Sequence, residues 1–334
     1  MSIIRAPDVL PLSDAIGRRI ESLRLSLTEV CNFRCTYCLP DGYKKPCQRP
    51  AELTVEEIRR AVTGFAQLGL WKVRLTGGEP TLRRDFEDVA RTVASIPGIR
   101  RVAMTTNGYR LADRAQVWRD CGISALNISV DSLDPARFAA ITGHDRLGEV
   151  LRGIEAARDA GFDGIKLNAV LMRGVNDDEL AAMVQFVTTR DLSLRFIEVM
   201  RTNDNTAFFD RHHVAGQSVI DRLEAVGWHR LPRSAGAGPA VELGHPHAKG
   251  RIGIIAPYSR DFCASCNRLR MSSEGKLHLC LFGDGGIDLK PLLAQDDPAP
   301  LVARIRALVG TKAPAHRLHS SNSGATPHLA SIGG

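Results

Sequence analysis

Strand and helix signals alternate six times between residues 23 and 199, and this alternation constrains the fold more than any other feature of the sequence. The first strand signal, 23–27, alternates apolar and polar residues, and the first helix signal opens with a capping box formed by Thr54 and Glu57. Successive strand–helix units form a parallel sheet with right-handed crossovers. We therefore predict an α/β fold, a partial (β/α)6 TIM-type barrel. The expected strands are 23–27, 71–75, 101–105, 125–130, 165–170 and 192–199, with helices near 54–68, 85–95, 111–121, 146–160 and 177–188.

Residues 201–260 differ in character, because Pro, Gly, His and Ser become dense and only short strand signals remain, at 241–243 and 251–255. We place the end of the barrel near residue 215 and predict two domains, 1–215 and a smaller C-terminal region, 216–334. His245-x-His247 lies in this stretch, and two loop histidines at this spacing are expected to be solvated.

The composition is that of a soluble globular protein, with 44% hydrophobic and 24% charged residues. No apolar run has the length of a membrane span, and the N-terminus carries charges where a secretory signal would be apolar. The cysteines are grouped at metal-binding spacings, which fits a reducing cytoplasm. The net charge of +7 suits an anionic ligand, and it is equally compatible with weak nucleic-acid affinity.

Cys31, Cys35 and Cys38 follow the first expected strand at C-x3-C-x2-C spacing. Three thiolates on one loop can hold three irons of a [4Fe–4S] cluster and leave the fourth iron open, whereas a four-cysteine ferredoxin run closes that position. A zinc loop needs a fourth ligand, and no residue near Cys38 supplies one. The spacing therefore predicts a cluster with an open, catalytic iron.

A second set, Cys263, Cys266 and Cys280, has C-x2-C-x13-C spacing. From spacing alone a zinc ribbon completed by His278 or by a distant residue stays open. Arg268 and Arg270 share one face of a probable strand beside these thiols, and guanidinium groups suit phosphate oxygens. We favour a second open cluster that receives a phosphorylated, nitrogen-bearing substrate.

The first cysteine set, with Tyr37 before its last cysteine, resembles the signature of the radical S-adenosylmethionine (SAM) enzymes, and the run Gly77-Gly78-Glu79-Pro80 resembles their methionine-binding motif. The resemblance implies that SAM binds the open iron and is cleaved to methionine and a 5′-deoxyadenosyl radical, which abstracts hydrogen. In such enzymes the cofactor supplies the difficult chemistry and the protein positions it.

The segments 31–38, 76–80 and 263–270 and the ending Ser-Ile-Gly-Gly together resemble the GTP-cyclising family that begins molybdenum cofactor biosynthesis. This implies a lyase in which a second [4Fe–4S] cluster binds guanine, hydrogen leaves ribose C3′, and the C3′ radical attacks C8 to give 3′,8-cyclo-7,8-dihydro-GTP. It also implies a flavodoxin- or ferredoxin-type reductant, a downstream cyclic pyranopterin monophosphate synthase and a homodimer, with no nucleic-acid or membrane partner.

The resemblance assigns roles to individual residues. Cys31, Cys35, Cys38, Cys263, Cys266 and Cys280 are the expected cluster ligands, and Gly333 and Gly334 are expected to enter the active site. The expected SAM contacts are Tyr37, Gly78, Ser129 and Met200, and the expected GTP contacts are Arg24, Arg74, Thr105, Lys166, Arg268 and Arg270.

Two other functions remain to be weighed. A radical SAM peptide-modifying maturase with an auxiliary cluster usually carries more C-terminal cysteines and lacks the arginine pair. An RNA-binding protein with a zinc ribbon would suit the positive charge, but aromatic residues are only 5% of the chain and fall at core positions. The sequence contains no Walker GxxxxGK[ST] and no GxGxxG motif, so hydrolytic nucleotide chemistry has no support.

Overall fold

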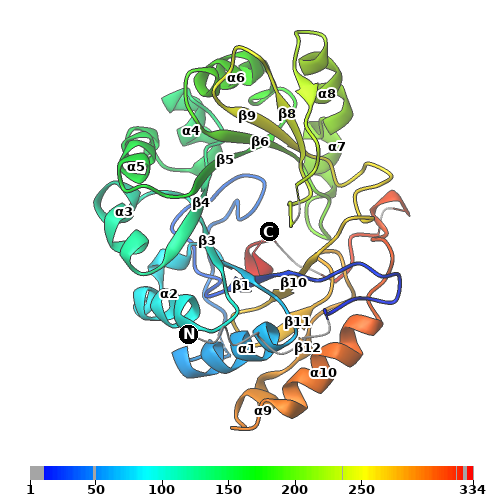
Figure 1. Cartoon of the computed structure of the whole chain (residues 1–334). Coiled ribbons are helices and arrows are strands. Elements are labelled where there is room, and N and C mark those ends of the chain that lie inside the picture. Colours follow the sequence, from blue (N-terminus) through cyan, green and yellow to red (C-terminus); the bar gives the residue numbers. More distant parts are fainter. Residues whose placement is uncertain (1–10, 48–49, 235, 321, 326–328, 334) are drawn as a thin grey trace, which may run out of the picture.

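The computed structural model describes residues 11–47, 50–234, 236–320, 322–325 and 329–333. Six parallel strands follow one another in sequence and in space, which confirms the predicted succession of strand–helix units. Figure 1 shows them as a curved sheet with the connecting helices on its outer side. The strands are β1 (Ser22–Ser26), β2 (Lys72–Thr76), β3 (Arg101–Thr106), β4 (Ile123–Ser129), β5 (Gly164–Leu171) and β6 (Ser193–Glu198).

The connecting helices form where the apolar periodicity places them. In α1 (Val55–Gln67) the Thr54 hydroxyl accepts from the Glu57 amide and the Glu57 carboxylate accepts from the Thr54 amide, so the capping box is confirmed. A short helix that the sequence analysis did not foresee, α4 (Pro135–Thr142), starts at the Asp134 cap. The other helices of this half are α2 (Phe86–Ser95), α3 (Leu111–Asp120), α5 (Leu147–Asp159) and α6 (Leu180–Thr188).

The C-terminal part of the chain extends the sheet at both edges. β9 (Arg251–Ile255) pairs parallel with β6, and β10 (Arg268–Met271) pairs parallel with β1. Beyond them the pairing is antiparallel, giving the order β12-β11-β10-β1-β2-β3-β4-β5-β6-β9-β8-β7. A boundary at 215/216 stays a prediction, and one sheet runs through both parts. The remaining elements are β7 (His229–Arg230), β8 (Val241–Gly244), β11 (Lys276–His278), β12 (Ile287–Asp288), α7 (Thr206–His212), α8 (Gly216–Glu224), α9 (Lys290–Leu293) and α10 (Ala299–Gly310).

The strands bury apolar side chains against the helices, and the chain's last turn, η4 (Leu329–Ile332), lies inside the curve of the sheet (Figure 1). Within the described ranges, no helix combines the length and apolarity that crossing a membrane requires. The carboxyl ends of the parallel strands and the loops that follow them form the region where ligands bind in such folds. The candidate active site lies at these strand ends and loops.

Candidate active site

One cavity of about 280 Å³ gathers both cysteine sets and every residue expected to contact SAM or GTP. Its wall comes from the inner side of the sheet, the loop after β1 and the loops around β10. Its lining includes Arg24, Cys31, Cys35, Tyr37, Cys38, Arg74, Gly78, Thr105, Ser129, Lys166, Met200, Cys263, Cys266, Arg268, Arg270 and Cys280. Residues more than 200 positions apart in the sequence therefore face the same space.

The first thiol triad lies on the loop after β1, which packs against the end of α4. The amides of Arg34 and Thr36 donate to the carbonyls of Thr142 and Ile141, both at 3.0 Å. Burial raises the pKa of the Cys31 thiol to about 11, and burial together with the charge of Cys31 raises the pKa of Cys38 to about 12. Thiols in such a place become thiolates when they ligate a metal.

The donor set of this loop fits a [4Fe–4S] cluster. The three thiols are free and half-buried. Among the described residues, no three His, Cys, Asp or Glu side chains converge as ligands of a single metal ion. A cluster does not need such convergence, because each thiolate binds a different iron.

The loop after β2 lies directly against the first triad's loop. The amides of Gly78 and Glu79 donate to the carbonyls of Thr28 and Val30, both at 2.8 Å. A Cβ at Gly78 would collide with the Val30 carbonyl, so the close approach that glycine allows here is to the chain's own backbone. The buried Glu79 carboxylate accepts from the Asn107 amide at 2.7 Å, which ties the ends of β2 and β3 together.

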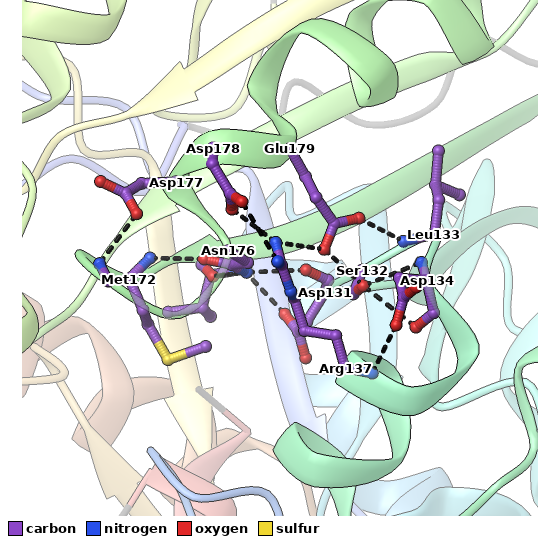
Figure 2. A network of polar contacts seen from close by, with 12 residues as sticks. Asp131, Ser132, Leu133, Asp134, Arg137, Met172, Asn176, Asp177, Asp178 and Glu179 are labelled. Carbon is purple, nitrogen blue, oxygen red and sulfur yellow. Dashed lines mark hydrogen bonds and ion pairs between the residues drawn. The ribbon is translucent and has the colours of Figure 1, made fainter.

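A polar network around Asp131 and Asn176 fixes the ends of β4 and β5 (Figure 2). It also reaches Tyr37. The buried Asp131 carboxylate accepts from the Tyr37 hydroxyl at 2.9 Å and from the Val170 amide at 2.8 Å. The Asn176 side chain donates to the carbonyls of Asp131 and Val170, at 2.7 and 2.9 Å. Burial raises the pKa of Asp131 to about 6. The network thus holds the aromatic residue of the cysteine loop against the strand that carries Ser129.

The strand register builds a cationic wall. Arg24 on β1 lies between Arg74 on β2 and Arg270 on β10. Two residues earlier, Ser22 lies between Lys72 and Arg268. Burial and the neighbouring arginines lower the pKa of Arg74 to about 9 and that of Arg270 to about 10. Buried cations that repel one another in this way favour an anionic ligand.

Two cations of this wall, Lys72 and Arg195, were missed in the sequence analysis. Lys72 lies two residues before Arg74 on the same face of β2, and this alternation could have revealed it. Arg195 on β6 pairs with Glu242 at 2.6 Å, yet its Nε is buried with no hydrogen-bond partner in the described structure. A second orphaned atom in the lining, Asn168 Oδ1, is also buried. Such orphaned groups indicate a polar ligand.

The second thiol triad faces the cavity from the loop before β10 and the end of β11. The Cys266 amide donates to the Cys263 carbonyl at 3.1 Å, which brings these two thiols to the same turn. His278, the alternative zinc ligand, lies on β11 with its ring against Gly286, and it does not belong to the cavity lining. Since the described residues include no convergent single-ion site, the zinc-ribbon alternative gains no support.

The C-terminal turn reaches the arginines of β1 and β10. Arg270 donates to the carbonyl of Ile332 at 3.1 Å and also to that of Gly333, and Arg24 lies 3.4 Å from the Gly333 carbonyl. Gly334 lies outside the described residues. The two arginines therefore serve the chain's own end as well as the cavity.

Comparison with known proteins matches two family models to successive parts of the chain. The family model described as Radical SAM superfamily matches residues 25–187, and the one described as Molybdenum Cofactor Synthesis C matches residues 192–318. The crystal structure of Streptococcus suis SuiB bound to S-adenosylmethionine has the same fold, with a TM-score of 0.61, 13% identity, and coverage of 86% of this chain and 68% of that one. Fold and site thus define a radical SAM protein, a class whose members carry a [4Fe–4S] cluster and use SAM.

Close relatives narrow this class. The GTP 3′,8-cyclase of Stenotrophomonas maltophilia (strain K279a) is 56% identical over 97% of this chain and 99% of its own length. Those of Aeromonas hydrophila and Vibrio cholerae (strain ATCC 39541) are 55% and 53% identical, over 97% and 96% of this chain and 96% and 97% of their own lengths. The chain belongs to the GTP 3′,8-cyclase family.

Proposed function

We propose that this protein converts GTP into 3′,8-cyclo-7,8-dihydro-GTP, the first step of molybdenum cofactor biosynthesis. The observation that carries the proposal is one cavity that both thiol triads and a cationic wall line together. The high identity to GTP 3′,8-cyclases over nearly the whole chain agrees with it. The peptide-maturase alternative does not account for the arginine rows, and the RNA-binding alternative does not account for two thiol triads that line the same cavity as these arginines.

Two [4Fe–4S] clusters are proposed. Cys31, Cys35 and Cys38 would hold the first, and Cys263, Cys266 and Cys280 would hold the second. When bound, the reduced first cluster and SAM supply the radical that removes hydrogen from the ribose C3′ of GTP. The chain's own contribution is to position both reactants and to exclude water from the space between them.

The cationic wall would bind the triphosphate. Arg24, Arg74 and Arg270 lie in register, so their guanidinium groups can each contact phosphate oxygens of an extended chain of phosphates. Lys166 belongs to the same group of phosphate-binding cations. Lys72 and Arg195, which line the same cavity, are added to the group. With the triphosphate fixed there, the guanine would face Cys263 and Cys266, and Thr105 would contact the nucleoside.

The opposite side of the cavity would bind SAM. Tyr37, held by Asp131, and the loop of Gly78 line the cavity with the first triad. Ser129 is the last residue of β4, and Met200 follows β6. Gly333 and Gly334 would act at the GTP side, where Arg24 and Arg270 already contact the end of the chain.

Further elements of the proposal concern the cell. The clusters need an electron, for which we propose a flavodoxin- or ferredoxin-type donor, and the product would pass to a cyclic pyranopterin monophosphate synthase. We place the reaction in the cytoplasm because all eight cysteines are free. A homodimer and a division into domains at 215/216 complete the proposal.

The first test is formation of 5′-deoxyadenosine by anaerobically reconstituted protein with SAM and a reductant, with GTP, with ATP and without nucleotide. We expect GTP, and not ATP, to stimulate 5′-deoxyadenosine formation, because only guanine would bind at the second cluster in the required orientation. Cys266→Ala should abolish the stimulation while the N-terminal cluster remains. Cys121→Ala, which removes a buried thiol outside both triads, is the matched control. SAM cleavage that ignores GTP would refute the cyclase assignment and leave the radical SAM class intact.

A further inference from the structure

Lys312 is a buried cation without a carboxylate partner. It follows α10, its residue is 5% exposed, and its ammonium group donates to the carbonyl of Leu279, the residue before Cys280. Within the described part of the chain, no Asp or Glu lies within ion-pair distance of it. A buried charge is costly unless an opposite charge compensates it. Lys312 therefore requires a nearby anion.

The second thiol triad can supply such an anion, because thiols that ligate a metal do so as thiolates. Lys312 reaches this triad beside Cys280, since its ammonium group donates to the carbonyl of the preceding residue, Leu279. Lys312 is not among the residues that line the cavity, so it meets the triad from outside the space proposed for the substrate.

A buried arginine fastens the segment after Lys312 to the triad. Arg18 forms an ion pair with Asp14 at 2.5 Å and donates to the carbonyl of Cys263 at 2.9 Å. It also donates to the carbonyls of Ala313 and Pro314, at 2.8 and 2.6 Å. The guanidinium group thus joins one cysteine of the triad to the two residues that follow Lys312. Arg18 and Asp14 are 8% and 6% exposed, so water does not compete for these contacts.

The same segment contacts the triad again four residues after Lys312. The backbone amide of His316 hydrogen-bonds the Cys263 thiol. The His316 ring is fixed from both sides, because Nε2 lies 2.9 Å from the Pro257 carbonyl and Nδ1 accepts from the Leu318 amide at 3.3 Å. Residues 312–316 therefore contact the second triad at two places, beside Cys280 through Leu279 and at the thiol of Cys263.

We propose that Lys312 is a positioning residue of the second cluster: the buried counter-charge of its thiolates, held in place by Arg18. The inference rests on the second cluster of the proposed function. A cation beside the thiolates offsets the negative charge of a cluster, which favours its retention and raises its reduction potential. Groups that support metal ligands in this way typically contribute roughly ten- to a hundred-fold to metal affinity.

The test compares wild-type protein with Lys312→Met, Lys312→Gln and Lys312→Arg, all reconstituted and purified anaerobically in the same way. Iron and sulfide per chain, the rate of iron loss to a chelator and the midpoint potential of the second cluster are measured. Lys290→Met is the matched control, because Lys290 also donates to a carbonyl, that of Ala51 at 2.8 Å, and lies outside the cavity.

Wild type should hold about eight irons per chain, four for each cluster. The Met and Gln variants should release the second cluster roughly ten-fold faster or more, and what remains of it should have a lower potential. The Arg and Lys290→Met variants should resemble wild type. Gln retains a donor but no charge, so it also serves if the Met variant does not fold.

Two results would overturn the inference for different reasons. Wild type with about four irons would remove the second cluster, and the proposed function would fall together with the role of Lys312. A full complement of iron in the Gln variant, with unchanged release and potential, would leave the second cluster in place and refute the role of Lys312 alone.

Discussion

At the scale of single residues, burial changes the pKa values of the side chains that line the cavity. Lys72 and Lys166 stand on the sheet among arginines, where burial first and Coulomb repulsion second lower the pKa of each lysine to about 7. The ordinary pKa of lysine is near 10.4, so without a bound anion both lysines are only partly charged at neutral pH. A bound triphosphate would reverse the repulsion and favour the charged form of both.

We therefore expect GTP binding to take up protons, increasingly so as the pH rises through about 7. The sign follows from the direction of the shift: the free site loses its lysine protons near pH 7, the occupied site keeps them, and affinity consequently falls as pH rises. Titration calorimetry in buffers of different ionisation enthalpy measures the uptake. Lys166→Met should reduce it, and binding that releases or exchanges no protons near pH 8 would contradict the expectation.

At the scale of elements, the register of three strands places like charges side by side. Arg24, Arg74 and Arg270 occupy the same row of β1, β2 and β10, and like charges in such a row destabilise a sheet. The arginine row therefore lowers the stability of the ligand-free protein, while it provides a wall that can bind an anion. The sheet should therefore be more stable when one charge of the row is removed.

Arg74→Gln should raise the midpoint of thermal unfolding without ligand by about 2 °C, which corresponds to relief of about 1 kcal/mol. The same variant should lose most of the stabilisation that GTP gives to wild type, because a phosphate contact is missing. Scanning fluorimetry of anaerobic samples with and without GTP measures both effects. Arg222→Gln, on the exposed surface of α8, removes the same charge elsewhere. An Arg74→Gln variant less stable than wild type without GTP would contradict the prediction.

The elements themselves were predictable because their signals are local. The alternation at 23–27 and the cap at Thr54 gave β1 and α1 within one or two residues. The signal at 251–255 coincides with β9, but nothing in that stretch shows that it pairs with β6. Pairing between distant segments depends on the whole packed core, so the sequence reveals a strand and not its neighbour.

The site was likewise predictable only in its local parts. Both thiol triads were found from their spacing, whereas their placement in one cavity was expected only from the resemblance to a known family. Lys72 and Arg195 were missed because a single charged residue in a short strand also has a solvent-exposed interpretation. The alternation with Arg74 could have indicated Lys72, and the register, in which Ser22 lies between Lys72 and Arg268, places it in the cationic wall.

At the scale of the whole molecule, one sheet joins the two parts of the chain that differ in composition. The C-terminal part supplies β10 to the free edge of β1 and β9 to the free edge of β6, so a chain ending near 215 would expose both edges of its parallel sheet. Unpaired edges are aggregation sites, and parallel sheets occur almost only fully covered. The lining of the cavity would also lose Cys263, Cys266 and Arg270.

We accordingly expect residues 1–215 expressed alone to aggregate, although they contain the complete first triad and all six strand–helix units. Co-expression with residues 216–334 should recover some soluble, iron-containing complex, because both missing strands are then available for pairing. Gel filtration and iron content measure the outcome, with the uncut chain as the reference. A monomeric, cooperatively unfolding 1–215 fragment that retains its cluster would show that the first half folds as an independent domain. Pairing with β9 and β10 would then not be needed for the six parallel strands to fold. The predicted boundary at 215/216 would mark a folding unit as well as a change in composition.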